Sequence, residues 1–214
     1  MSSENLPGTG IQVGEDGKAR CWWAVGDPLY LPYHDTEWGR PSADDRRLFE
    51  KLSLEGFMSG LSWLTILRKR DAFREAFADF DPEVVAGFDH DDEQRLLADS
   101  RIVRNRAKIA ATINNARRCR DLRVEFGSLA AYVWGFEPPP RTGLLDRSAL
   151  MGIKFSPEAA AMSKDLRKRG WAFVGPTTVY SFMEAMGLVN DHLQHCHVAR
   201  EVEEQRKSFR RPAR

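Results

Sequence analysis

Repeated helix-boundary signals are the feature of this sequence that most limits its fold. Asp81-Pro82 and Ser156-Pro157 each place a capping side chain directly before a proline, the residue favoured at the first helical position. Asn105 precedes apolar residues at steps of three and four, which form one face of a helix. We find no run of alternating polar and apolar residues typical of strands. The sequence therefore predicts an all-α fold of many short helices.

Local chemistry predicts further helix boundaries. Ser42 to Asp45 has the spacing of a capping box before an apolar pattern. The helix after Pro157 is expected to end in a basic run at Gly170, where cations suit the negative end of the helix dipole. Gly175-Pro176 indicates a turn, after which Thr177 or Thr178 is expected to cap another helix.

Length and composition favour a single globular domain, with two lobes allowed. The chain has 214 residues, of which 42% are hydrophobic and 29% charged. These proportions are globular, and a chain of this size can bury a sizeable core. Residues 1–19 are polar and glycine-rich, which predicts a mobile tail before a domain at 20–197. The arginine-rich segment 198–214 is predicted to be a second, basic tail.

Charge and cysteine content limit the partners and the compartment. The chain has 32 Lys+Arg against 31 Asp+Glu, so bulk charge gives no argument for nucleic acid and local clusters must supply it. No apolar run approaches the length of a membrane span, and the first residues lack the pattern of a signal peptide. Three cysteines favour a reducing compartment. We expect a cytoplasmic monomer without membrane contact, associated with the nucleoid in a bacterium.

Two Cys/His pairs near the ends of the predicted domain suggest a metal site. Cys21 and His34 lie near its start, and His192 and Cys196 are spaced so that both face one side of a helix. Two thiolates and two imidazoles complete a tetrahedral zinc shell, which leaves no open position for catalysis. The alternative is two buried thiols with surface histidines. His195 and His197 keep the local choice of ligand open.

An aromatic cluster precedes a carboxylate in an apolar stretch. Residues 22–38 contain three tryptophans and two tyrosines, and Glu55 lies in the glycine-punctuated segment 54–63. A buried carboxylate is costly without a partner, so Glu55 either points to water or reads a ligand. Ring faces attract cations, so the second option predicts a pocket for a flat, positively charged molecule.

Residues 101–108 form a basic segment that ends in a predicted helix start. Arg101, Arg104, Arg106 and Lys108 place four cations in eight residues. Backbone N–H groups at a helix start can hold a phosphate, which favours nucleic-acid binding. The alternative is a solvated helix face.

Several motifs together give the sequence a family resemblance, over about residues 20–197, to DNA-3-methyladenine glycosylase I. The first half contributes Cys21-x12-His34, Asp27-Pro-Leu-Tyr30, Tyr33-His-Asp35, Glu37-Trp-Gly39, Leu54-Glu-Gly56 and Gly60-Leu-Ser-Trp63. The second half contributes Arg104-Asn-Arg106, Lys108-Ile109, Phe173-Val-Gly175, Tyr180-Ser-Phe-Met183 and Gly187-Leu-Val-Asn-Asp-His192.

The resemblance implies a helix-hairpin-helix, monofunctional DNA glycosylase that removes alkylated purines, chiefly 3-methyladenine, from double-stranded DNA in base excision repair. It implies structural zinc that joins the N- and C-terminal segments, bound by Cys21, His34, His192 and Cys196. It places Glu55 as the residue that reads the base and Leu61 as the wedge that enters the base stack. The pocket walls are then Tyr30, Tyr33, Trp63 and Trp23, with Met58 beside them.

Two residues depart from the family pattern, and they keep alternatives open. Met58 stands where the family has glutamine, which makes the pocket wall less polar and allows a different or bulkier alkylpurine. Arg101 stands where the hairpin has glycine, so a charged side chain either disturbs or replaces the backbone grip on phosphate. A catalytically silent protein that binds damaged DNA is the alternative of a different class. A zinc hydrolase is disfavoured because four protein ligands leave the ion closed.

Overall fold

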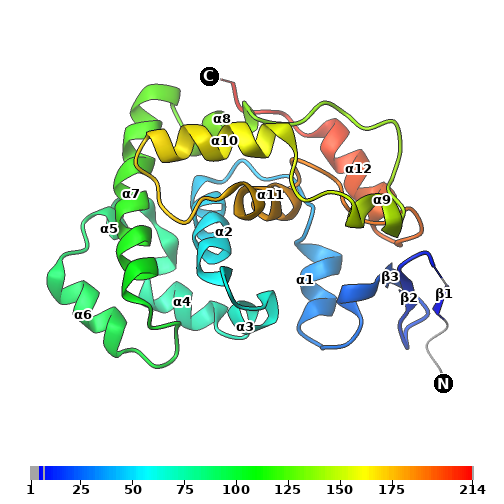
Figure 1. The fold of residues 1–214 in the computed structure, drawn as a ribbon, viewed down its shortest axis with the longest axis horizontal. Helices are drawn as coiled ribbons and strands as arrows, with labels where there is room; N and C mark the ends of the chain where they lie inside the picture. The colour runs from blue at the N-terminus through cyan, green and yellow to red at the C-terminus, as the bar shows by residue number, and fades with distance from the viewer. Residues whose placement is uncertain (1–4, 7, 214) are drawn as a thin grey trace.

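A computed structural model describes residues 5–6 and 8–213, with side-chain detail from residue 8 onward. The described part is mainly helical, as predicted (Figure 1). Its helices are η1 (Trp22–Ala24), α1 (Tyr30–Thr36), α2 (Asp45–Met58), α3 (Trp63–Leu67), α4 (Arg70–Ala76), η2 (Ala78–Phe80), α5 (Pro82–Ala86), α6 (His90–Ala98), α7 (Arg106–Phe126), α8 (Leu129–Trp134), α9 (Arg147–Met151), α10 (Pro157–Lys168), α11 (Pro176–Ala185) and α12 (Ala199–Ser208). Within these described residues, no helix combines the length and apolar character that crossing a membrane demands.

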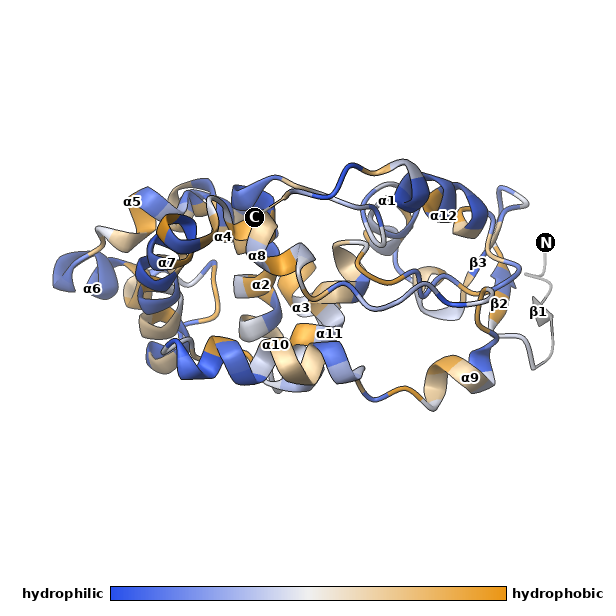
Figure 2. Cartoon of the chain, turned by 90° about the horizontal axis from the view of Figure 1, so that it is seen from above, coloured by the Kyte–Doolittle hydropathy of each residue, from blue (hydrophilic) through white to orange (hydrophobic). Residues whose placement is uncertain are grey.

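Helix α2 is the central element of the fold. It contacts α3, α7, α8 and α11, and its residues from Leu48 to Phe57 are all buried. In Figure 2 the apolar faces of α2, α8, α10 and α11 meet in the middle of the molecule, while α4 to α7 lie at one end and the small sheet at the other. Because α2 is enclosed, any charged side chain on it needs a partner inside the protein.

The predicted caps at Asp81, Asn105 and Ser156 are confirmed, since each side chain accepts a hydrogen bond from a backbone N–H in the first turn of its helix. Two other predicted caps are wrong. Asp44, not Ser42, caps α2 by accepting from the N–H groups of Arg46 and Arg47. Helix α11 starts directly after Gly175, with Pro176 in its first turn and no side-chain cap.

The prediction that the chain contains no strands and begins with an unstructured tail is wrong for the described residues. Strands β1 (Asn5–Leu6), β2 (Ile11–Val13) and β3 (Ala19–Cys21) form an antiparallel sheet in the order β1-β2-β3. Ile11 is buried in a small apolar cluster with Cys21 and Leu193. Strands of two or three residues are too short to show alternation, which explains why the sequence pattern missed them.

The C-terminal segment, predicted as a frayed or weakly helical basic tail, is helical, but the prediction that it lies outside the packed domain is wrong. Residues Ala199–Ser208 form α12, whose Val202 is fully buried. Arg206 is buried as well, and its guanidinium donates to the carbonyl oxygens of Gly187, at 2.7 Å, and Leu188, at 2.8 Å. Its charge is therefore used inside the protein to bind the turn after α11.

That turn brings the two ends of the domain together at Gly187. The backbone there has φ +75°, and a Cβ atom would lie 2.6 Å from the Pro41 nitrogen and 2.7 Å from the Gly39 oxygen. The Gly39 N–H donates to the carbonyl of Ala185 at 3.1 Å. Only glycine permits the backbone at 187 to come so close to the backbone of residues 39–41. This contact places the segment after α1 against the segment that leads to His192.

We predict that Gly187→Ala lowers the free energy of unfolding by about 3 kcal/mol, because it adds a left-handed alanine and a clash with backbone atoms. Gly127→Ala is the matched control, since Gly127 has φ +84° but no atom within 4 Å of its added Cβ. That variant should cost only about 1 kcal/mol. Urea denaturation of both variants measures the difference, and equal losses would contradict the close approach.

Candidate active site and metal centre

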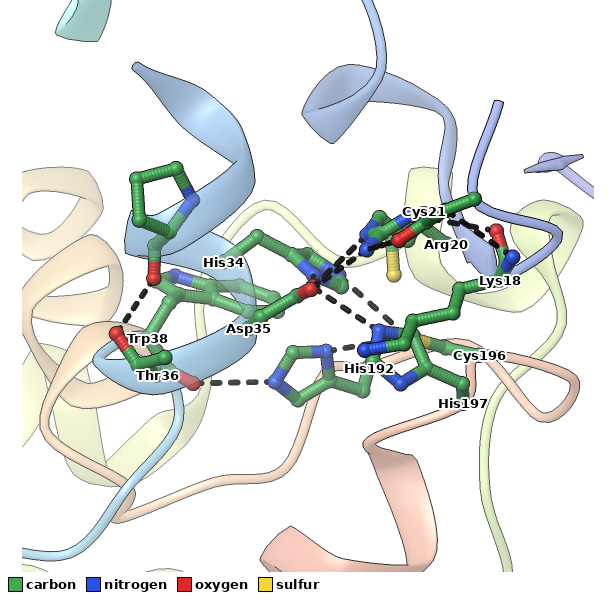
Figure 3. Close-up of polar contacts among 12 residues, drawn as sticks. Lys18, Arg20, Cys21, His34, Asp35, Thr36, Trp38, His192, Cys196 and His197 are labelled. Carbon is green, nitrogen blue, oxygen red and sulfur yellow. Dashed lines mark hydrogen bonds and ion pairs between the residues drawn. The ribbon is translucent and has the colours of Figure 1, made fainter. Parts of the chain in front are cut away.

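The two predicted Cys/His pairs meet in one buried cluster. Cys21 lies at the end of β3, His34 lies in α1, and His192 and Cys196 lie in the segment before α12 (Figure 3). All four are buried, and their ligand atoms lie within 4.8 Å of one another. Residues far apart in the sequence therefore converge on one small volume, in which they could hold a metal ion.

The distances within this cluster suit a tetrahedral metal shell. Cys196 Sγ lies 3.4 Å from His34 Nε2 and 3.6 Å from His192 Nδ1. Bond lengths of about 2.3 Å to sulfur and 2.0 Å to nitrogen predict a sulfur–nitrogen edge of roughly 3.5 Å around zinc. The chemistry of the donors and their separations both agree with such an ion.

Each histidine of the cluster also has a partner for its second ring nitrogen. His34 Nδ1 lies 2.8 Å from Asp35 Oδ1, and His192 Nε2 lies 3.1 Å from the Trp38 carbonyl oxygen. These acceptors orient the rings and leave the other nitrogen free to ligate. Burial lowers the pKa of His192, which favours the neutral form that binds metals.

The structure places His192 with Cys21, His34 and Cys196, and it places His197 in a second group with His34 and Asp35 that could also hold a metal ion. His195 is exposed, and His197 is bound to Asp35, with His197 Nε2 3.0 Å from Asp35 Oδ1. Arg20 also donates to Asp35, so this carboxylate connects the outer layer of the cluster (Figure 3). Hydrogen bonds from Arg20, His34 and His197 hold the pKa of Asp35 well below its usual range, although partial burial opposes them.

The predicted base-binding residues also meet, in a cavity of about 480 Å³ beside the cluster. Its lining includes the expected residues Trp23, Tyr30, Tyr33, Glu55, Met58 and Trp63, together with Trp22 and Trp38. The opposite wall, which was not predicted, comes from α11, from the end of α9 and from the segment after α9: Leu150, Met151, Ile153, Lys154, Thr177, Tyr180, Ser181 and Glu184. No local pattern marks these residues, because only the packing of α11 on α2 brings them here.

Glu55 is the buried acid of this cavity. Its side chain lies on the last turns of α2 and the residue is 3% exposed, so the alternative that it points to water is wrong. Oε1 lies 2.7 Å from Lys51 Nζ. Oε2 is buried and has no hydrogen-bond partner among the described residues. A buried carboxylate oxygen without a donor is an acceptor available to a ligand.

Lys51 was missed by the sequence analysis, although it stands one helical turn before Glu55. Its ammonium donates to Tyr33 Oη at 2.7 Å and lies 3.2 Å from the centre of a Trp63 ring. The signal was the four-residue spacing of Lys51 and Glu55 on a helix that is otherwise apolar at this point.

A second acid, Glu184, lies across the cavity on α11. Burial, followed by the charge of Asp191, raises the pKa of Glu184 well above its usual value, which disfavours the charged form of its carboxyl. Asp191 is fully buried and accepts a hydrogen bond from Tyr180 Oη at 2.8 Å, and it pairs with Arg141.

Leu61 lies just beyond the cavity in the turn after α2. It is among the exposed large apolar side chains, at 44%. Gly60 before it has φ +79°, which turns the chain sharply away from the helix. Leu61 is therefore an exposed apolar side chain on a turn, and its role as a wedge stays a prediction.

The basic segment divides into exposed and internal cations. Arg101 is bound by Asp99 and Glu75, and Arg106 by Glu93. No ion pair holds the exposed Arg104 in the described part of the chain. Lys108 departs from the prediction: it is buried and donates to the carbonyl oxygens of Phe57, at 2.8 Å, and Ser59, at 2.6 Å. It binds the end of α2 and is not available to a phosphate.

Comparison with known proteins shows the family of the chain. The model of the methyladenine glycosylase family matches residues 23–200. The chain is 46% identical over 180 residues to DNA-3-methyladenine glycosylase 1 of Escherichia coli, covering 83% of this chain and 95% of the relative. It is 40% identical over 178 residues to DNA-3-methyladenine glycosylase of Haemophilus influenzae, covering 83% and 96%.

Solved structures show the same fold. A crystal structure of 3-methyladenine DNA glycosylase I has a TM-score of 0.78 and 44% identity, over 83% of this chain and 98% of that one. The Staphylococcus aureus enzyme, solved to explain 3-methyladenine recognition, has a TM-score of 0.78 and 40% identity, over 83% and 95%. The chain thus belongs to the methyladenine glycosylase family.

Proposed function

We propose that this chain is a monofunctional DNA glycosylase that hydrolyses the N-glycosidic bond of alkylated purines in double-stranded DNA, chiefly 3-methyladenine. One observation carries the proposal: the free Oε2 of Glu55 lies in a cavity walled by aromatic rings. The family relationship supports the same reaction, because the relatives are 3-methyladenine glycosylases by name.

Hydrolysis of this N-glycosidic bond needs little from the protein beyond binding of the flipped base. Methylation at N3 gives the adenine of the nucleotide a positive charge, and the base leaves as a neutral molecule when the bond to the sugar breaks. A strong acid is therefore unnecessary. Glu55 accepts a hydrogen bond from the exocyclic amino group of the flipped base, the rings of Tyr30 and Trp63 enclose it, and water attacks the sugar cation.

DNA binding is assigned to the turn at Leu61 and to the segment between α6 and α7. Leu61 fills the space that the flipped base leaves in the stack. Helices α6 and α7 joined by residues 99–105 correspond to the helix-hairpin-helix element, with exposed Arg104 beside the N-terminus of α7. Phosphate binding there would fix the register of the protein on the duplex.

The proposal predicts that the protein releases 3-methyladenine from methylated duplex DNA, as identified by mass spectrometry of the free bases. Other alkylpurines among the released bases would show a wider range of substrates, which the thioether of Met58 in the cavity wall allows.

We expect Glu55→Gln to slow single-turnover excision by roughly 10- to 100-fold, since hydrogen bonds to a charged group contribute about 1.5–3 kcal/mol. Its affinity for DNA should be nearly unchanged.

Excision by Glu55→Gln at the wild-type rate would contradict the role of the carboxylate. If wild-type protein binds methylated DNA but releases no base, the chain is a silent binder of damaged DNA, and the glycosylase proposal fails.

We propose structural zinc at the Cys21, His34, His192 and Cys196 cluster. The donor set, the sulfur–nitrogen distances and the paired second nitrogens of both histidines support it. Four protein ligands leave no open coordination position, so the ion would hold β3, α1 and the segment before α12 together.

Removal of the metal should therefore lower the stability of the fold, and excision activity should be lost only as a consequence of unfolding. We expect elemental analysis to find zinc at one ion per chain, and chelation to lower the melting temperature, with loss of excision following the loss of fold. Cys196→Ser should reproduce the effect of chelation. Metal-free protein with an unchanged melting temperature would contradict the assignment.

The different positions of Arg104 and Lys108 predict different salt effects. Arg104→Met should weaken DNA binding and reduce the salt slope of the affinity by about one, because one phosphate contact is lost. Lys108→Met should leave that slope unchanged and lower the stability by roughly 1–3 kcal/mol, because two buried carbonyls lose their donor. Fluorescence anisotropy across a salt series separates the two variants, and a reduced slope for Lys108→Met would show that this lysine does reach DNA.

A further inference from the structure

Lys51 lies behind the cavity wall and contacts three of its residues. Its ammonium is 2.7 Å from Glu55 Oε1, 2.7 Å from Tyr33 Oη and 3.2 Å from the centre of a Trp63 ring. All three partners line the cavity, whereas Lys51 is buried and is not part of the lining. The ammonium is thus held in place by the residues that meet the base.

This arrangement changes the electrostatics of the cavity. The positive charge of Lys51 compensates the carboxylate of Glu55 and draws electron density from the indole ring of Trp63. Burial raises the pKa of Glu184, the other acid of the wall, which disfavours its charged form. Lys154 adds an exposed positive charge among the lining residues. The positive charges of Lys51 and Lys154 therefore oppose the attraction of Glu55 for a cation.

We propose that Lys51 is a positioning residue that sets the charge preference of the base pocket. It holds Oε1 so that Oε2 stays free for the base, and its charge makes the pocket bind an uncharged purine nearly as well as a cationic one. The inference deepens the proposed function on which it rests: binding selects shape and hydrogen bonding, and the selection for positive charge is left to the rate of bond breakage.

Binding of two small purines tests this directly. At mildly alkaline pH the free base 3-methyladenine is uncharged, whereas 3,9-dimethyladeninium keeps its positive charge and resembles the base in the nucleotide. Isothermal titration calorimetry gives the affinity of each for the wild type and for Lys51→Met, whose unbranched side chain has a similar length. We expect the preference for the cation to rise roughly tenfold or more, because unit charges a few ångströms apart interact strongly inside a protein.

Control variants separate charge from packing. Lys51→Arg keeps the positive charge and should keep the wild-type preference. Lys51→Gln keeps a hydrogen-bond donor without the charge, and it takes the place of Lys51→Met if that variant does not fold. Lys108→Met removes another buried ammonium that contacts α2 but lies outside the cavity, and its preference should equal that of the wild type.

The outcomes distinguish the two proposals. If the wild type binds both purines and neither uncharged variant changes their affinity ratio by more than about twofold, the role of Lys51 is wrong and the proposed function stands. If Lys108→Met shifts the ratio as much as Lys51→Met, the effect is structural and the inference is again overturned. If the wild type binds neither purine and releases no base from methylated DNA, the proposed function fails as well.

Discussion

Burial of a carboxylate among aromatic rings is costly, and the ion pair between Glu55 and Lys51 is what makes it tolerable here. The pair uses one oxygen of Glu55 and leaves the other without a donor among the described residues. Under the proposed function, the amino group of a flipped purine donates to that oxygen. The packing of α2 in the core and the proposed capture of the base would then depend on the same interaction.

The metal centre and the base cavity share their supporting residues. Trp38 lines the cavity and accepts from His192 through its carbonyl oxygen, and Trp23 lies against both Trp38 and His34, with ring centres 5.0 and 5.1 Å apart. A metal ion at the cluster would thus fix the aromatic wall as well as the chain ends. Under the zinc proposal, a closed site without catalytic chemistry would in this way still support the base cavity.

Features with a local physical cause were predictable from the sequence, whereas those made by packing were not. The caps at Asp81, Asn105 and Ser156 depend on neighbouring residues alone, and the metal cluster and aromatic wall were found through their motifs and the family resemblance. The short strands and the burial of α12 arise from contacts between the two chain ends. Lys51 drew no prediction and Lys108 was predicted to bind DNA, because only the tertiary structure shows the carbonyls, rings and acid that these lysines meet.

The most direct test of the central claim is a crystal structure of the protein soaked with 3-methyladenine. We expect the base between the aromatic walls of the cavity, with an amino or ring N–H group roughly 2.7–3.2 Å from Glu55 Oε2, the range of a normal hydrogen bond. A base bound elsewhere, or a Glu55 side chain turned away from a base in the cavity, would contradict the account.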